Sequence, residues 1–232
     1  MKSFHISEAH KKVGLDGNLI FWISMIKESQ KVLKPNVRKN ILDFGCGDGK
    51  FLKLFDLMDN LENGLGIDLD KRLIKTAKKD NAKDKINYKI SKKKTLKKLD
   101  NHFDAVYSQE VIYTIKDLKA HATAIFNSLK SGGFYFSTMG SHIENPLWSK
   151  RRKIIREEED YYAYDYSIEE VAEVFYSVGF EVGIKRLPVE YFLVYHPKYT
   201  KGFSNSLVDL VDTTYENKMM FSFWKPYDKK DS

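Results

Sequence analysis

The chain has 232 residues, of which 42% are hydrophobic and one is a cysteine, and its net charge is +7 at neutral pH. This length is enough for one large α/β domain with a full core, and the composition excludes a disordered chain. The single cysteine, Cys46, excludes an internal disulfide framework and favours a reducing compartment, so we expect a cytoplasmic protein.

Neither secretion nor membrane insertion is expected. Met1 to Ser7 lacks the apolar core of a signal peptide, and the longest apolar run, Leu19 to Ile23, is far too short to span a bilayer. The positive charge permits nucleic-acid binding. However, only six of the 39 basic residues are arginines, the residue type that reads phosphates and bases through its planar fork. A lysine excess of this kind is more typical of a solvated surface.

A helix and then a glycine-rich unit open the chain. Asp16 to Leu33 has the apolar spacing of a helix, which we expect to pack on the sheet edge or to cover a ligand site. Residues 41–55, ILDFGCGDGKFLKLF, then predict a buried strand, a turn through Gly45, Gly47 and Gly49, and a second helix. Because glycine has no Cβ, such a turn can press its backbone N–H groups and a helix N-terminus against a ligand.

Four more strands are predicted in alternation with helices, over 64–68, 86–90, 103–107 and 134–139. The helix that starts around Leu118 is expected to close at Ser131-Gly132-Gly133, and Lys92 to Lys98 forms a lysine-rich connection. This alternation predicts βαβ units and a parallel sheet. Right-handed crossovers bring the loops after the strands to one edge, so we expect one crevice lined by Gly45, Asp68, Ser108 and Gly140.

The last third of the chain is less regular. Asn145-Pro146 is expected to open a helix that runs to about Asp160, and Ser167 to Glu170 is a capping box that starts another helix, with Gly179 past its end. Residues 180–184 alternate as a half-exposed strand, a short helix is expected around Leu207, and Lys218 to Trp224 predicts a final antiparallel strand.

These elements predict the α/β fold class: a Rossmann-like, seven-stranded, mostly parallel sheet with an antiparallel last strand and helices on both faces. We expect a single domain over residues 1–232, with an N-terminal helical cap at 1–35 and substrate-side insertions at 140–166 and 188–217. There is no internal repeat, and only the Lys229 to Ser232 tail is expected to be disordered.

The spacing of the glycines narrows the class of ligand. A mononucleotide P-loop requires Lys-Ser/Thr after its last glycine, but Phe51 follows Gly49-Lys50 here, and a dinucleotide fold requires Gly-x-Gly-x-x-Gly. Asp43, just before the turn, suits a cationic group better than a pyrophosphate. Asp68 ends the second strand, where a carboxylate can accept hydrogen bonds from ribose hydroxyls. S-adenosylmethionine is the commonest cofactor with that chemistry; alternatively, the two acids order the loop and cap a helix without a ligand.

Five segments in this order resemble the motifs of class I S-adenosylmethionine-dependent methyltransferases, of the broad group that acts on small molecules. The similarity covers about residues 38–187, and its segments are Asp43–Gly49, Gly64–Asp68, Phe103–Val111, Leu129–Phe134, and Tyr166–Glu170 with Gly179–Phe180.

This resemblance implies a set of cofactor contacts. The turn at Gly45, Cys46 and Gly47 would hold the methionine part beside Asp43, with Cys46 as a small packing residue and not a nucleophile. Other contacts would come from the ribose-binding Asp68, the adenine-packing Leu69, and the backbone of Ser108 and Gln109 near the methionine amine. The family usually has an acidic or amide residue after the third strand to bind the adenine amine; here either Ser91 substitutes for it or the adenine is held by packing.

The expected reaction is methyl transfer to an oxygen or nitrogen of a small metabolite or sugar precursor, with S-adenosylhomocysteine as product and no metal site. Such a displacement mainly needs alignment and exclusion of water. His142 is the candidate base, or else a solvent-exposed loop histidine, and Glu110 and Tyr113 could line the acceptor site, although Tyr113 is equally suited to the core. Residues 140–166 form the expected substrate cover, with Trp148 and Arg152 as candidate binding residues.

Half of the arginines of the chain lie at positions 151–156, which favours an anionic, phosphorylated or carboxylated acceptor. Pairing of these arginines with Glu157 to Glu159 explains them equally well. Two other functions stay open: an RNA or protein methyltransferase, which the basic surface would permit, and a non-catalytic binding module. The sequence lacks an Asp/Asn-Pro-Pro-Tyr segment after the fourth strand and a second cysteine, which disfavours DNA methylation.

Overall fold

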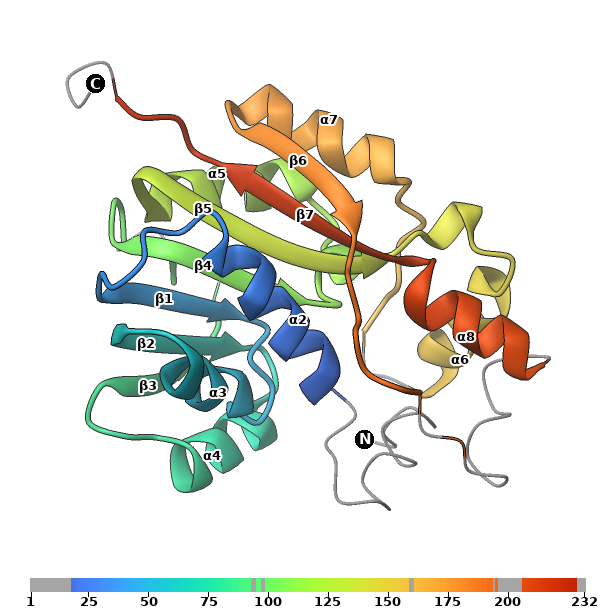
Figure 1. Ribbon diagram of the computed structural model, residues 1–232, viewed down its shortest axis with the longest axis horizontal. Coiled ribbons are helices and arrows are strands. Elements are labelled where there is room, and N and C mark those ends of the chain that lie inside the picture. Colours follow the sequence, from blue (N-terminus) through green and yellow to red (C-terminus); the bar gives the residue numbers. More distant parts are fainter. Residues whose placement is uncertain are drawn as a thin grey trace.

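The computed structural model describes residues 18–92, 95–96, 99–158, 161–193, 195 and 206–228. These residues form one seven-stranded sheet with the strand order β3-β2-β1-β4-β5-β7-β6. Helices cover both of its faces, and the long, twisted sheet crosses the whole molecule (Figure 1). The fold class predicted from the sequence is confirmed.

Most of the elements coincide with the predicted ones. The strands are β1 (Lys39–Phe44), β2 (Leu61–Asp68), β3 (Ile86–Ile90), β4 (Phe103–Gln109), β5 (Leu129–Gly140), β6 (Glu181–Arg186) and β7 (Lys218–Trp224). The helices are α2 (Leu19–Gln30), α3 (Lys50–Met58), α4 (Lys71–Asp80), α5 (Leu118–Ser128), α6 (Trp148–Glu158), α7 (Ile168–Val178) and α8 (Leu207–Tyr215), with short 3-10 turns η2 (Ile112–Thr114) and η3 (His142–Glu144).

The first five strands are parallel to one another, and β7 pairs antiparallel with both β5 and β6. The final strand therefore lies between β5 and β6, with Gly140 at the end of β5 opposite Lys218 at the start of β7. The carboxyl ends of β1, β2, β4 and β5 all point to the right-hand side of Figure 1. The convergence of loops that the sequence predicts at this edge is what a parallel sheet produces.

The predicted end of the helix that starts at Leu118 is wrong. The helix expected to close at Ser131-Gly132-Gly133 ends at Ser128, and β5 already begins at Leu129. Leu129 pairs with Phe103 of β4, and two contacts from the far end of the chain hold this segment: Lys225 Nζ donates to Leu129 O over 2.7 Å, and Gly132 N donates to Lys225 O over 3.1 Å. The Lys229 to Ser232 tail and part of the Lys92 to Lys98 connection lie outside the described residues.

The core has one apolar cluster on each face of the sheet. On one face, α2 and α3 pack against β1, β4 and β5, and Tyr107 Oη of β4 donates to Ser29 Oγ of α2 over 2.7 Å. On the other, α5 and α7 cover an aromatic group in which Phe175 stacks on Phe223 with 3.9 Å between ring centroids. Helix α2 thus lies on the face of the sheet, instead of only at its edge, and its first residues reach the carboxyl edge.

Candidate functional site

The glycine turn between β1 and α3 has the geometry that its sequence requires. Gly45, Gly47 and Gly49 have φ angles of 81°, 54° and 87°, the left-handed region that favours glycine. A Cβ at Gly45 would lie 2.4 Å from Val111 Cγ2, whereas a Cβ at Gly47 would meet no atom within 4 Å. The turn is therefore packed against the protein at Gly45 and open at Gly47, where a ligand has room to contact the backbone.

Asp43 lies at the carboxyl end of β1 and is buried, with 5% of its surface exposed. Its Oδ2 atom has no hydrogen-bond partner among the described residues. Burial, followed by repulsion from Asp68 and Asp48, holds the pKa of this carboxyl well above its ordinary value. A buried carboxylate oxygen without a partner is costly, and a cationic group on a ligand would satisfy it. The ammonium and sulfonium of S-adenosylmethionine are groups of that kind.

Asp68 joins β2 to the glycine turn. Its Oδ2 accepts a hydrogen bond from Gly47 N over 2.9 Å, and its Oδ1 accepts one from Asp70 N over 2.8 Å. The loop-ordering role is thus present in the structure. Because each carboxylate oxygen has two acceptor sites, Asp68 can still receive ribose hydroxyls at the same time. The cap of α4 is Asp70 instead, whose side chain accepts from Arg72 N and Leu73 N.

The residues expected around the adenine lie beside Asp68. Leu69 is 79% exposed, which leaves its side chain available to a flat ring, and Ser91 donates its backbone N–H to Asp68 O over 2.7 Å. Cys46 is buried, and burial with repulsion from Asp43 raises the pKa of its thiol. This agrees with a packing role for Cys46 and makes it a poor nucleophile.

At the end of β4, Ser108 and Gln109 point to opposite faces. The Ser108 hydroxyl is buried in a network with Tyr135 Oη at 2.6 Å and Ser137 Oγ at 2.8 Å, so only its backbone can contact a ligand. The side chain of Gln109 donates through Nε2 to Asn18 Oδ1 at the start of α2, over 3.3 Å. This contact attaches the N-terminal helix to the carboxyl edge.

The residues that were predicted, after β4 and β5, to line the site of the methyl acceptor lie close together. Tyr113 is buried, and its ring lies 4.7 Å from the ring of His142 and 5.9 Å from that of Trp148. His142 stacks face to face on Trp148 with 3.6 Å between centroids. The alternative of an exposed loop histidine is wrong, because His142 is 3% exposed. Its Nδ1 atom has no hydrogen-bond partner among the described residues.

The arginines of α6 differ in their surroundings. Arg152 forms an ion pair with Asp165, which also accepts a 2.6 Å hydrogen bond from Trp148 Nε1. Arg156 donates to Ala163 O and lies over the ring of Tyr162. Arg151 is the one whose electrostatic neighbours include Glu110 and Tyr113, although burial lowers the pKa of its guanidinium. Of these three arginines, Arg151 is therefore the one that interacts electrostatically with residues predicted to line the methyl-acceptor site.

Two residues that the sequence did not single out belong to this region. Thr138 near the end of β5 is buried, and its Oγ1 has no partner among the described residues. Lys218 at the start of β7 forms an ion pair with Glu110 over 2.9 Å. The pairing of β7 with β5 brings Lys218 to the edge, whereas Thr138 reaches it as part of β5 itself. Across the described part of the chain, no group of three or more His, Cys, Asp or Glu side chains is placed to hold a metal ion.

Burial of histidines should make this protein sensitive to acid. Burial lowers the pKa of both His121 and His142 from 6.5 to about 3, with repulsion from Lys218 and Arg151 contributing at His142. Since the unfolded chain takes up these protons first, stability is lost as the pH falls below 6.5. We expect His142→Gln to reduce the slope of unfolding free energy against pH, from about pH 6 to about pH 4.5, by about 1.4 kcal/mol per pH unit. Urea unfolding at several pH values measures this, and equal slopes in both proteins would contradict it.

Comparisons with known proteins agree with this geometry. A family model for the methyltransferase domain matches residues 42–137, which run from β1 into β5. No curated protein matches the chain. The chain is similar to a solved structure from Haloferax volcanii, a complex of the Trm112 methyltransferase activator with a candidate methyltransferase, at 17% identity and a TM-score of 0.75, over 91% of this chain and 92% of that chain.

Two further solved structures show the same fold. Haemonchus contortus phosphoethanolamine N-methyltransferase 2, in complex with S-adenosyl-L-methionine, matches with 18% identity and a TM-score of 0.67 over 90% of this chain and 56% of that chain. An S-adenosylmethionine-dependent methyltransferase from Mesorhizobium loti matches with 16% identity and a TM-score of 0.65 over 88% of this chain and 97% of that chain.

None of the helices in the described ranges is both long and apolar enough to cross a membrane. The family match covers the strands that carry the glycine turn, Asp43, Asp68 and the Ser108-Gln109 edge, and the fold is that of the enzymes above. Residues 42–137 thus match the methyltransferase domain family, and this match together with the fold supports a class I S-adenosylmethionine-dependent methyltransferase with S-adenosylmethionine as its cofactor.

Proposed function

We propose that this enzyme methylates an oxygen or nitrogen atom of a small, anionic metabolite, carrying a phosphate or a carboxylate, in the cytoplasm. When bound, S-adenosylmethionine supplies a methyl group that passes to a lone pair of the acceptor as its bond to sulfur breaks, leaving S-adenosylhomocysteine. The observation that supports this proposal most is the partly buried Lys218 beside Glu110, at the edge where the aromatic cover of His142 and Trp148 begins.

The chain's own residues contribute mainly to positioning. Asp43 and the turn at Gly45 and Gly47 would hold the methionine part, and Asp68 with Leu69 would hold the nucleoside. The buried rings of Tyr113, His142 and Trp148 would exclude water from the acceptor. His142 is neutral at physiological pH because its pKa is about 3. It can therefore accept a hydrogen bond at Nδ1, but as a base it is weak until an anion offsets the cations around it.

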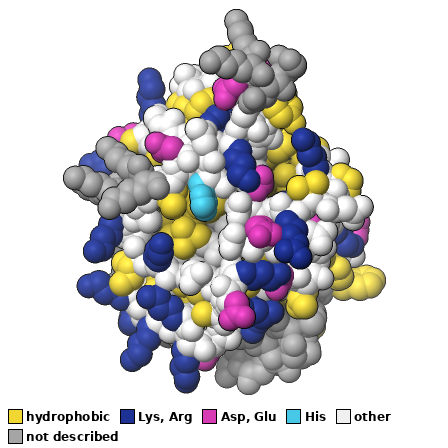
Figure 2. All heavy atoms as spheres, turned by 90° about the vertical axis from the view of Figure 1, so that its left-hand side faces the viewer, with side chains coloured by type: hydrophobic (Ala, Val, Ile, Leu, Met, Phe, Trp, Pro, Cys, Tyr) yellow, Lys and Arg dark blue, Asp and Glu magenta, His cyan; other side chains and the backbone are white. Residues whose placement is uncertain are grey.

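A small acceptor is better supported than a nucleic acid. Figure 2 shows the face at the amino ends of the parallel strands, where many Lys and Arg side chains are exposed and acidic side chains lie among them. That face is opposite the edge that carries Asp43 and Asp68 (Figure 1). Cations there contribute to the net charge of +7 without bordering the site. Strongly salt-dependent retention of the protein on immobilised tRNA would favour the RNA alternative instead.

The experiment that tests this function follows S-adenosylhomocysteine release while purified enzyme is incubated with S-adenosylmethionine and fractionated cell metabolites. We expect release to concentrate in fractions that bind to an anion exchanger, because their components carry phosphate or carboxylate groups. Release that depends only on RNA or protein fractions would contradict the proposal. The Asp68→Ala variant is a control, since it should lose both cofactor binding and release; equal binding after this change would refute the assignment of the ribose site.

A further inference from the structure

The ion pair between Lys218 and Glu110 has unusual surroundings. Lys218 begins β7, and Glu110 follows β4 with a φ angle of 57°, a left-handed conformation that a glutamate rarely adopts. Their side chains are 12% and 28% exposed. The nitrogen lies over the ring of Phe21 of α2, 5.0 Å from its centroid. This cation is thus held between the N-terminal helix and the loop after β4, at the carboxyl edge of the sheet.

Both members of the pair retain hydrogen-bonding capacity. Although Lys218 Nζ is 2.9 Å from Glu110 Oε1, the contact lacks hydrogen-bond geometry, and this buried oxygen has no hydrogen-bond partner among the described residues. An ammonium carries three donors, and buried polar groups normally find partners. His142 Nδ1, also buried, adds a further acceptor without a partner in the same part of the described chain. Polar groups in this state are typical of a site that completes its bonding with a ligand.

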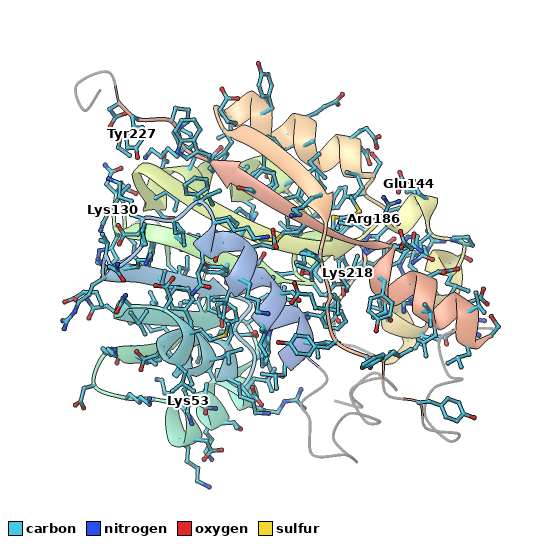
Figure 3. All side chains as sticks on the ribbon, viewed as in Figure 1. Lys53, Lys130, Glu144, Arg186, Lys218 and Tyr227 are labelled. Carbon is cyan, nitrogen blue, oxygen red and sulfur yellow. The ribbon has the colours of Figure 1, made fainter. Side chains whose placement is uncertain are left out.

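Figure 3 shows where this lysine lies relative to a second ion-paired lysine. Lys218 is at the start of β7, next to the carboxyl ends of the parallel strands, whereas Lys130 lies at the opposite end of the sheet. Lys130 pairs with Asp104, and both of its contacts, of 2.8 Å, have hydrogen-bond geometry. Lys130 is therefore a suitable control for Lys218: both contacts of its bridge have hydrogen-bond geometry, whereas the contact between Lys218 and Glu110 at the carboxyl edge does not.

We propose that Lys218 is the residue that binds the anionic group of the methyl acceptor, and that Glu110 is its counter-ion in the absence of acceptor. A phosphate or carboxylate oxygen can accept the donors that Glu110 leaves unused. Arg151, whose electrostatic neighbours include Glu110, would hold this carboxylate when Lys218 exchanges partners. The assignment of the anion to the acceptor rests on the proposed function; the anion site itself does not depend on it.

The register of the sheet explains why this residue is available for such a role. Lys218 faces Gly140, which has no side chain, at the last paired position of β5. A Cβ at Gly140 would lie 3.2 Å from His142 Cδ2, so the glycine also leaves room for the imidazole ring. The lysine, the imidazole and the loop after β4 can therefore approach one small volume without obstruction from β5.

Binding of simple anions tests this inference without knowledge of the acceptor. The protein, saturated with S-adenosylhomocysteine, is titrated calorimetrically with inorganic phosphate and, separately, with acetate at constant ionic strength. We expect Lys218→Met to weaken binding of the preferred anion by about tenfold or more, which corresponds to the loss of one charged contact. Glu110→Gln should tighten it by about threefold or more, since the lysine loses its competing counter-ion. Lys130→Met should leave it unchanged.

The opposite signs of the two site variants distinguish recognition from a structural role, because a merely disturbed loop would weaken binding in both. Affinity for S-adenosylhomocysteine and urea unfolding show that each variant is folded. Preference for phosphate identifies a phosphorylated acceptor, and preference for acetate a carboxylated one. Wild-type anion affinity in Lys218→Met, no tightening in Glu110→Gln, or no anion binding by the wild type would overturn the inference. Anion binding that needs Lys218, with no methylation of any metabolite, would instead refute only the proposed function.

Discussion

Replacing Asp43 with asparagine should weaken S-adenosylmethionine binding by about a hundredfold, the equivalent of a buried charged contact, and should not destabilise the cofactor-free protein. The carboxylate is 5% exposed, and its Oδ2 has no partner among the described residues. Without a ligand, this charge opposes folding, because burial disfavours the ionised form. With a cationic ligand, the same charge becomes the partner that the ligand needs.

The pH dependence follows from the direction of the pKa shift. The pKa of Asp43 is raised in the folded protein, so its contribution to stability is full at acidic pH and is lost as the pH rises through the folded value. A bound cation favours the ionised form, and cofactor affinity should therefore increase with pH over this window. Calorimetry in buffers of different ionisation enthalpy should detect proton release on binding by the wild type and none by Asp43→Asn. Equal affinity and equal proton release in both proteins would reject the role of Asp43.

Alanine substitutions at two neighbouring glycines should separate stability from cofactor binding. Gly45 and Gly47 both have positive φ angles, so each substitution costs about 1 kcal/mol of backbone strain. At Gly45 the new methyl group would also collide with Val111, 2.4 Å away. We expect Gly45→Ala to lose about 2–4 kcal/mol of unfolding free energy in total. Gly47→Ala should lose only the strain, but should weaken cofactor binding by more than about tenfold because its methyl group enters the open space.

Urea unfolding and calorimetry with S-adenosylhomocysteine measure the two effects. The double variant with Gly45→Ala and Val111→Ala should recover part of the lost stability, because the smaller side chain removes the collision but not the strain. If Gly47→Ala binds the cofactor as tightly as the wild type, the open space beside the turn is not the cofactor site. If Gly45→Ala has the same unfolding free energy as Gly47→Ala, the collision with Val111 does not reduce stability.

The sequence predicted correctly those features that depend on neighbouring residues, such as helix caps and tight turns. The Ser167 capping box is present with both of its hydrogen bonds, and Gly179 ends α7 in the left-handed conformation. The glycine turn could also be predicted from the sequence, because a turn with three positive φ angles in five residues strongly favours glycine at those positions. The start of β5 could not be predicted in this way, because Leu129 pairs with Phe103 of β4 and its carbonyl accepts a hydrogen bond from Lys225, which is 96 residues away in the sequence.

The cofactor side and the acceptor side of the site also differ in how far the sequence predicts them. Asp43, Gly45, Gly47 and Asp68 lie within one βαβ unit, whose spacing is visible in the sequence. The acceptor side depends on contacts between distant segments: Glu110 with Lys218 across 108 positions, and Trp148 with Asp165 beyond a helix. Arg152 was named from composition alone, and only the path of α6 shows that Arg151 is the arginine near Glu110.

The position of β7 between β5 and β6 has a consequence for the order of assembly during synthesis. Among the described strands, β6 pairs with β7 alone, so it has no ladder to join until residues 218–224 have been made. The pairing of β1 to β4, with the glycine turn, uses only residues that are made earlier, and chains generally begin to fold from the N-terminal side. The nascent enzyme therefore acquires the means to hold the methyl donor before it has the lysine proposed to recognise the acceptor.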